Sequence, residues 1–213
     1  MSRRALIIPF TISLVLACLT VQTAVAGDAV EPVAINEVFY LGDAAQDWME
    51  LINTGSTAVD LTNWWICSRF AYRRIGLLTI LMGDDYVLQP GELLVLATTI
   101  DLNSDAGADL GLYRSSSFGD PDAMADFVQW STSLRVGRSS EALAAGVWPG
   151  RDPVPVDFVV PAAAGETAAW CGGNSGGGEL TVALDFINGA PTPGAVNGVA
   201  CTEQLVYRDG FES

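Results

Sequence analysis

Oxygen-bearing side chains recur at alternate positions across residues 101–109. Asp101, Asn103, Asp105 and Asp109 take the first, third, fifth and ninth positions of this stretch. Carboxylate and amide oxygens at this spacing are typical of calcium-binding loops, but the twelfth position holds leucine where such loops carry a bidentate acid. Two hypotheses follow: a weak Ca²⁺ site, or a surface loop whose side chains cap its own turns.

A second candidate for chemistry is a basic and aromatic cluster. Arg69, Tyr72, Arg73 and Arg74 lie within a short stretch that also contains Phe70. Guanidinium forks bind carboxylate, sulfate or phosphate, and aromatic rings add a stacking surface. The alternative hypothesis is a loop whose arginines meet acidic surface residues, an arrangement that contributes little stability.

Histidine and lysine are absent from all 213 residues. Their absence excludes the Ser-His-Asp triad, histidine-based zinc sites, Schiff-base chemistry and the P-loop. Carboxylate chemistry remains, with Asp47 and Glu50, or Asp84 and Asp85, as candidate pairs for a hydrolase. We assign no catalytic residue, because a catalytic carboxylate needs a shaped pocket and a raised pKa that a sequence does not display.

The chain is strongly acidic. It has 25 Asp and Glu residues against 10 basic residues, all of them arginine, for a formal net charge of −15. A negative field repels phosphate backbones, so nucleic acid is not expected as a partner.

The N-terminus has the features of a secretory signal. Arg3 and Arg4 precede an apolar stretch at 6–21, and a small-x-small cleavage pattern ends at Ala26. We therefore expect residues 1–26 to be removed, a secreted or periplasmic mature chain, and no membrane span in that chain. A second interpretation is lipoprotein processing at Cys18.

Three cysteines remain beyond the signal, and in an exported protein two of them should oxidise. Cys171 and Cys201 are separated by a glycine-rich stretch, one expected strand and a Pro-Thr-Pro-Gly sequence. We predict a disulfide between these two. Cys67 is then a free thiol, interpreted as a small buried hydrophobe beside two tryptophans.

Short apolar stretches separated by turn residues predict an all-β sandwich. One helical turn is expected at 139–145, a tight turn at 89–91, and one residue of the pair Trp64 and Trp65 in the core, of which we favour Trp64. The expected strands are 33–39, 48–52, 58–61, 64–67, 77–82, 86–88, 92–97, 127–130, 167–170 and 180–186.

The order of several motifs resembles the lamin-tail domain (LTD) family of bacterial secreted type. They are INEV at 35–38, WMEL at 48–51, VDL at 59–61, LQPGELLVLA at 88–97 and GAPTPGAVNG at 189–198.

The resemblance implies an immunoglobulin-like β-sandwich over 27–198, with a C-terminal tail at 199–213. Residues 68–85 and 101–126 are interpreted as long loop insertions. The implied function is an exported, non-catalytic interaction module at the cell envelope or outside the cell, whose partner is an unknown protein or glycan. No cofactor is expected. The alternatives left open are a calcium-dependent carbohydrate- or matrix-binding module and a carboxylate-based hydrolase.

Overall fold

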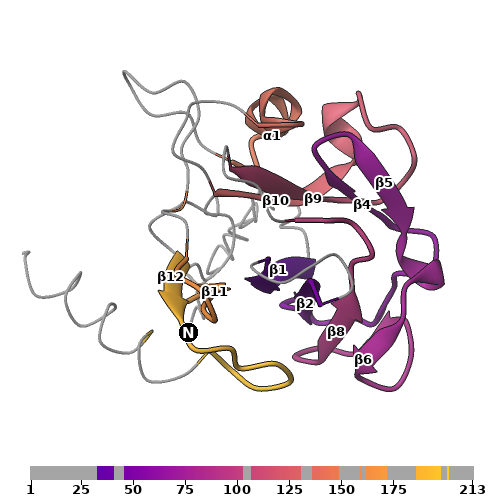
Figure 1. Cartoon of the computed structure of the whole chain (residues 1–213). Coiled ribbons are helices and arrows are strands. Elements are labelled where there is room, and N and C mark those ends of the chain that lie inside the picture. Colours follow the sequence, from indigo (N-terminus) through magenta and orange to yellow (C-terminus); the bar gives the residue numbers. More distant parts are fainter. Residues whose placement is uncertain are drawn as a thin grey trace, which may run out of the picture.

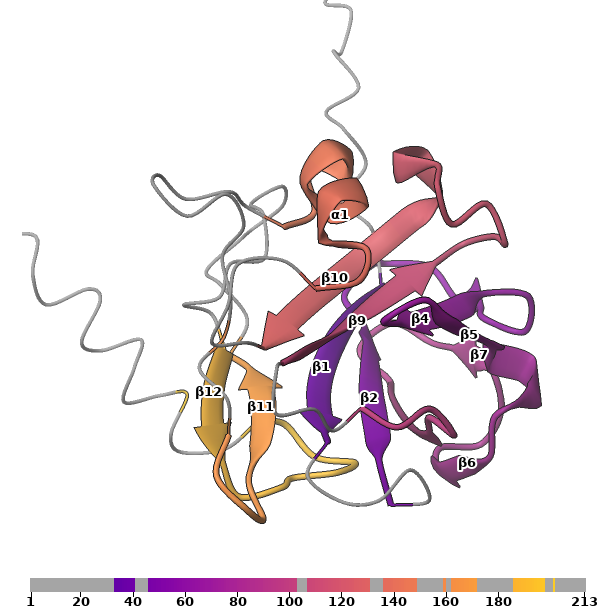
Figure 2. The same ribbon diagram turned by 45° about the horizontal axis from the view of Figure 1, so that its top comes forward.

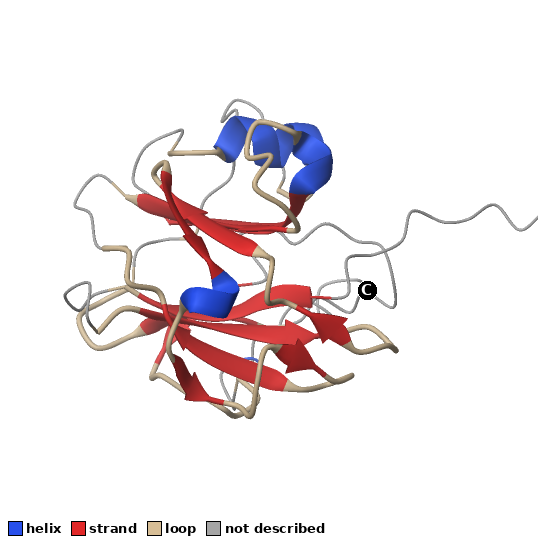
Figure 3. Cartoon of the chain, turned by 90° about the vertical axis from the view of Figure 1, so that its right-hand side faces the viewer, coloured by secondary structure: helices blue, strands red, loops and turns tan. Residues whose placement is uncertain are grey.

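Two antiparallel sheets pack face to face (Figures 1 and 3). The computed structural model contains twelve strands among the residues that it describes. The predicted all-β, immunoglobulin-like sandwich is confirmed. In this part of the chain no helix has the length and hydropathy of a membrane span. The described residues are 33–40, 46–102, 107–130, 136–148, 159, 162–171, 186–197 and 201.

The larger sheet has six strands in the order β12-β11-β1-β2-β8-β6. Its central pair, β1 and β2, comes from the motifs INEV and WMEL, and strands from the end of the described chain extend it on one side. The bounds are β1 Val33–Phe39, β2 Trp48–Asn53, β6 Ile80–Met82, β8 Leu93–Ala97, β11 Thr167–Trp170 and β12 Phe186–Gly189.

The smaller sheet has four strands in the order β10-β9-β4-β5, and β3 and β7 form a separate pair. Helix α1 packs against β10 on the face turned away from the larger sheet (Figures 2 and 3). The bounds are β3 Val59–Asp60, β4 Trp65–Ser68, β5 Ala71–Arg74, η1 Ile75–Leu77, β7 Val87–Leu88, β9 Ala108–Tyr113, η2 Pro121–Ala123, β10 Met124–Trp130 and α1 Ser139–Ala145.

A β-bulge in β1 determines which side chains enter the core. The register with β2 shifts between Ile35 and Glu37, so Ile35 and Val38 both lie on the inner face although they are three residues apart. The backbone N–H of Ile35 donates to Asp126 Oδ2 of β10 at 2.7 Å. Asp126 therefore joins the two sheets, and complete burial raises its pKa to about 7.

All residues of β9 and β10 are buried. Their inner face packs on the larger sheet, where Trp130 stacks on Tyr40 with ring centroids 4.3 Å apart. Their outer face is covered by residues near α1, and Trp148 contacts Phe127 edge to face. Burial on both faces explains why FVQW shows no strict alternation of apolar and polar residues.

The structure corrects two expectations, the loop insertions and the core position of Trp64. Residues 68–85 and 101–126 are not loop insertions, because they contain β5, β6, β9 and the start of β10. Trp64 and Trp65 both lie half-buried against the core, and neither is fully buried. The fully buried tryptophans are Trp130 and Trp148.

Other expectations are confirmed. A disulfide joins Cys171 and Cys201, whose Cα atoms are 5.0 Å apart. Cys67 is a buried free thiol, and burial raises its pKa to about 12, which removes nucleophilic character at neutral pH. The helical turn at 139–145 and the tight turn that contains Gly91 are also present.

Candidate functional site

The turn that joins β4 to β5 has an uncommon backbone. Ser68 pairs with Ala71, which leaves a two-residue loop of Arg69 and Phe70. Both loop residues are left-handed, with φ of 46° and 66°. Positive φ at both positions is the signature of a type I′ hairpin turn, which favours Asn-Gly because larger side chains are strained there. Phe70 is 58% exposed at the tip of this turn.

A buried carboxylate holds the turn in place. Asp109 of β9 accepts a hydrogen bond from the backbone N–H of Arg69 at 2.7 Å and another from that of Arg138 at 3.0 Å. Gly137 lies directly against it, and a Cβ at position 137 would be 2.2 Å from Asp109 Oδ2. Burial raises the pKa of Asp109, while these hydrogen bonds and the charge of Arg69 act in the opposite direction. Asp109 thus links the β4–β5 turn to the segment that leads into α1.

Arg138 completes the arrangement from the side of α1. Its guanidinium lies over the Phe70 ring at 5.0 Å and the Tyr72 ring at 5.9 Å from the centroids. Nη2 donates to the Tyr72 hydroxyl at 2.7 Å, and Nη1 pairs with Glu141 at 2.6 Å. These contacts orient the rings of Phe70 and Tyr72 and place the Arg138 guanidinium against their faces.

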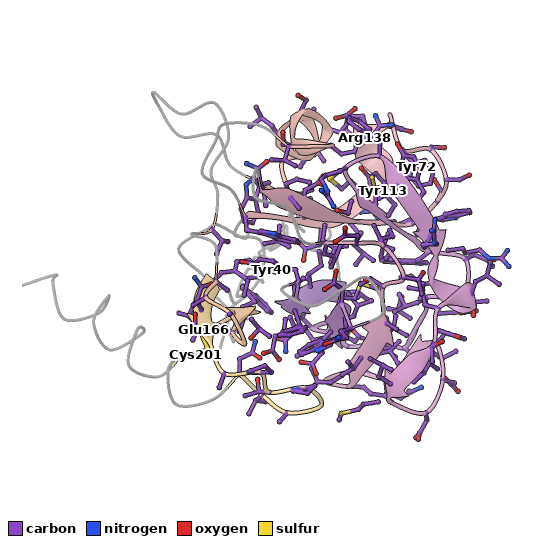
Figure 4. All side chains as sticks on the ribbon, viewed as in Figure 1. Tyr40, Tyr72, Tyr113, Arg138, Glu166 and Cys201 are labelled. Carbon is purple, nitrogen blue, oxygen red and sulfur yellow. A yellow bond between two sulfur atoms is a disulfide. The ribbon has the colours of Figure 1, made fainter. Side chains whose placement is uncertain are left out.

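Phe118 fills the space beneath this layer. It stacks on Tyr72 with centroids 3.9 Å apart and meets Trp65 and Tyr113 edge to face. A Cβ at Gly111 would be 2.9 Å from the Tyr113 ring, so the glycine makes room for that ring. Figure 4 shows Tyr72, Tyr113 and Arg138 close together at the outer side of the smaller sheet.

We call this region the hairpin surface, which comprises Arg69, Phe70, Tyr72, Phe118 and Arg138. Its side chains are held by aromatic contacts and by the hydrogen bond from Arg138 to Tyr72, and buried Asp109 holds the backbone of Arg69 and Arg138. Phe70 stays exposed. Pre-oriented aromatic and arginine side chains are the residue types that dominate binding energy in protein interfaces.

The predicted basic cluster is only partly brought together. Tyr72 and Arg74 lie on the outer face of β5, since they pair with Cys67 and Trp65 of β4. Arg73 points to the opposite face, as alternation along a strand requires. Arg69 lies in the turn, and its guanidinium donates to the carbonyl of Asp101.

Sequence reasoning missed Phe118 and Arg138 as members of this site. They lie more than 40 positions beyond Tyr72 in the chain, and no local motif marks them. The glycine before Arg138 is the only local signal, because a tight approach to a neighbour often requires glycine.

The predicted calcium ligands are not gathered in a described loop. Asp101 is exposed, whereas Asp109 is buried in β9 with both oxygens accepting backbone N–H groups. Asn103 and Asp105 lie outside the described residues. The described residues contain no group of three or more acidic or cysteine side chains suited to a metal ion. The calcium site stays a prediction from the sequence.

A second polar site lies on the outer face of the larger sheet, where Glu37 of β1 sits directly opposite Glu50 of β2. Both side chains are fully buried. Asn36 donates to Glu50 at 2.5 Å. Burial raises the pKa of Glu50 and the nearby Glu37 raises it further, while hydrogen bonds from Gly194 and Asn36 lower it.

The loop at residues 190–197 closes over these glutamates, and we call the assembly the glutamate latch. The Ala195 N–H donates to the Thr192 carbonyl at 3.0 Å, and Gly194 has φ of 77°, as in a type II turn with Pro-Gly at its centre. The Thr192 N–H donates to Glu37 at 3.0 Å, and the Gly194 N–H donates to Glu50 at 2.5 Å. The distant motifs INEV, WMEL and PTPG therefore meet in one structural unit.

The carboxylate pairs considered for hydrolysis do not form a site. Glu50 belongs to the latch, whereas Asp47 accepts a hydrogen bond from the Leu102 N–H at 2.7 Å. Asp84 and Asp85 are exposed, and Asp85 caps the N–H of Val87 in its own turn.

Comparison with known proteins identifies the family. The family model of the Lamin Tail Domain matches residues 27–142, more than half of the chain. The chain belongs to the lamin tail domain family. The match includes both anchoring segments of the hairpin surface and ends before β11, β12 and the latch loop, which the structure nevertheless joins to β1.

Solved structures show only distant likeness. The archaellum periplasmic stator protein FlaG from Sulfolobus acidocaldarius matches with 16% identity and a TM-score of 0.29, covering 38% of this chain and 86% of that one. The stator protein complex of FlaF and FlaG from the same organism matches with 15% identity and a TM-score of 0.29, covering 50% and 90%. This likeness carries no functional argument. No curated protein matches the chain significantly.

Proposed function

We propose that this lamin tail domain protein is an exported, non-catalytic interaction module of the bacterial secreted type, and that it binds its partner through the hairpin surface. The partner is an extracellular or envelope protein or glycan. Nucleic acid is disfavoured by the net charge of −15.

The exposed ring of Phe70 carries this proposal. A left-handed phenylalanine costs on the order of 1–3 kcal/mol, and Asn or Gly would form the same turn without that cost. The ring is 58% exposed, so burial in the core does not compensate for this strain. Strain of this kind clusters at ligand-binding sites, where the surrounding structure holds it.

Export is supported by two independent features. The Cys171–Cys201 disulfide persists in oxidising compartments such as the periplasm or the extracellular space. Residues 1–26 have the pattern of a cleaved signal. We accordingly propose a domain at 27–198 and a tail at 199–213.

A non-catalytic role is supported by the carboxylates. Glu37, Glu50, Asp109 and Asp126 all accept hydrogen bonds from backbone N–H groups. These hydrogen bonds give the four carboxylates structural roles, which supports a non-catalytic module.

Retention on isolated envelope material tests the proposal. We expect Phe70→Ser to weaken retention at least about tenfold, as for a central aromatic in an interface, while the melting temperature stays near that of the wild type. Val196→Ser is the matched control, because Val196 is 79% exposed outside the hairpin surface. Equal retention of the two variants and the wild type would refute the assignment of this surface.

A further inference from the structure

Strand β5 forms one edge of the smaller sheet. Among the described strands it pairs only with β4. Figure 1 shows it at the outer rim of that sheet, on the side away from β10. A strand at a sheet edge offers backbone N–H and C=O groups to another chain.

The register identifies the backbone groups that face outward. The Ile75 N–H donates to the Trp64 carbonyl at 2.8 Å, so this pair is hydrogen-bonded. Hydrogen-bonded and non-bonded pairs alternate along antiparallel strands, so Arg74 and Tyr72 belong to non-bonded pairs. Their N–H and C=O groups point away from β4. The Tyr72 carbonyl accepts from the Arg73 guanidinium at 2.8 Å.

The same edge concentrates positive charge on an acidic chain. Arg69, Arg73 and Arg74 fall within six consecutive residues of a protein that has 25 acidic and 10 basic side chains. Arg73 is exposed, and Phe70 is exposed at the end of the strand. Opposite charge steers an acidic partner segment to such an edge.

We propose that the free edge of β5 binds an extended acidic peptide segment as an additional β-strand. The proposal rests on the proposed function, and it specifies the partner as protein. The segment forms main-chain hydrogen bonds with Tyr72 and Arg74, its carboxylates meet the arginines, and Phe70 contacts an apolar side chain beyond the strand end. Peptide recognition by strand addition uses this division between main-chain affinity and side-chain specificity.

Substitutions at position 74 separate the contribution of the backbone N–H to peptide binding from that of the arginine side chain. Arg74 has φ of −80° and ψ of 132°, a conformation that proline adopts, and its N–H points away from β4. Arg74→Ala removes the side chain with its charge and keeps the backbone N–H. Arg74→Pro also removes the outward N–H and keeps the β4 ladder intact.

The probe is a fluorescein-labelled peptide of alternating Glu and Val, followed by anisotropy. We expect Arg74→Ala to weaken binding severalfold in a salt-dependent manner, and Arg74→Pro to weaken it about fivefold more, as for one lost hydrogen bond. A peptide N-methylated at alternate residues should bind at least about tenfold more weakly. Unchanged melting temperatures of both variants confirm that the fold is retained.

Three outcomes overturn the inference. They are equal affinity of the N-methylated peptide, equal affinity of the two Arg74 variants, and no binding of the peptide to the wild type at millimolar concentration. Heparin oligosaccharide is the probe for an anionic-glycan site. Such a site is indicated instead if Arg74→Ala weakens heparin binding relative to the wild type and Arg74→Pro weakens it no further. In each case the Phe70→Ser retention assay still decides the proposed function separately.

Discussion

The glutamate latch and the hairpin surface use the same physical device for different ends. In each, buried carboxylates accept backbone N–H groups from a segment distant in the sequence. In the latch, Glu37 and Glu50 hold a turn flat against the sheet. At the hairpin surface, Asp109 holds a strained turn that presents an aromatic ring and arginines outward.

The comparison shows how a structural site differs from a binding site. The latch turn has the residues its geometry favours, with proline and glycine at the centre of a type II turn. The β4–β5 turn has Arg69 and Phe70 where a type I′ turn favours Asn and Gly. The strained turn places an exposed aromatic ring, Phe70, at its tip, which is expected when that side chain serves recognition.

The largest expected effect comes from breaking the Asp109 anchor. Gly137→Ala places a Cβ 2.2 Å from the carboxylate at a position with φ of 49°. We expect a loss of about 3–5 kcal/mol in the free energy of unfolding, from the left-handed alanine and the displaced hydrogen bonds. Denaturant unfolding measures this loss.

Gly146→Ala is the control for that experiment. Gly146 also has positive φ, at 72°, but a Cβ added there would meet no atom within 4 Å. It should cost only about 1–2 kcal/mol. Equal losses for the two glycines would show that Asp109 contributes nothing through its packing against Gly137.

Removing the disulfide tests how much it stabilises the region around the glutamate latch. Cys201 follows the latch loop, and Cys171 follows β11, with a separation of 30 residues. Replacing both by serine should lower the free energy of unfolding by about 3 kcal/mol through the larger entropy of the unfolded chain. The hairpin surface should keep its near-native aromatic circular dichroism. Loss of that signal at temperatures where the double variant is folded would show that the two regions depend on each other.

The pKa of Glu50 in the latch and that of Asp109 at the hairpin surface are raised. The pKa of Asp126, which lies between the sheets, is raised as well. A raised pKa means that the folded state binds the proton more tightly, so the stability is present at low pH and declines as pH rises. For Asp126 the window extends from its ordinary value of 3.8 to about 7. We expect stability to fall by a few kcal/mol across this range.

Asp126→Asn separates this group from the other acids. Asparagine accepts only one of the two hydrogen bonds from Ile35 and Phe127, so it should cost about 1 kcal/mol at pH 5. The variant should be less sensitive to pH between 5 and 8 in calorimetry. A wild-type stability that increases over that interval would contradict the raised pKa values.

The smallest expected change in stability comes from relaxing the strained turn. Replacing Arg69 by Asn and Phe70 by Gly installs the favoured type I′ residues and should raise the free energy of unfolding by up to about 1 kcal/mol. The same change should abolish partner binding. A clear loss of stability would mean that the Phe70–Arg138 contact outweighs the strain, and would weaken the distinction between the two regions.

The sequence alone determined several strands of the fold, a tight turn and the disulfide. Short apolar stretches bounded by turn residues located β1, β2, β8 and β11 to within one residue. In β1 the apolar and polar residues also alternate, as the geometry of a strand favours. The Pro90-Gly91 pair located a turn because its backbone preferences are intrinsic. Cysteine positions and an exported context led to the correct disulfide.

Only the tertiary structure decided which surfaces face solvent and which side chains meet. Residues 101–126 were predicted to be a loop insertion, and oxygen-bearing side chains recur at 101–109. Asp109 nevertheless lies in β9, where two backbone donors from distant segments satisfy its carboxylate inside the protein. Arg138 joins Phe70 and Tyr72 through the packing of α1 on β10, a contact that no local pattern encodes. Local preferences act over a few residues, whereas burial and hydrogen-bond pairing depend on which chain segments the fold places side by side.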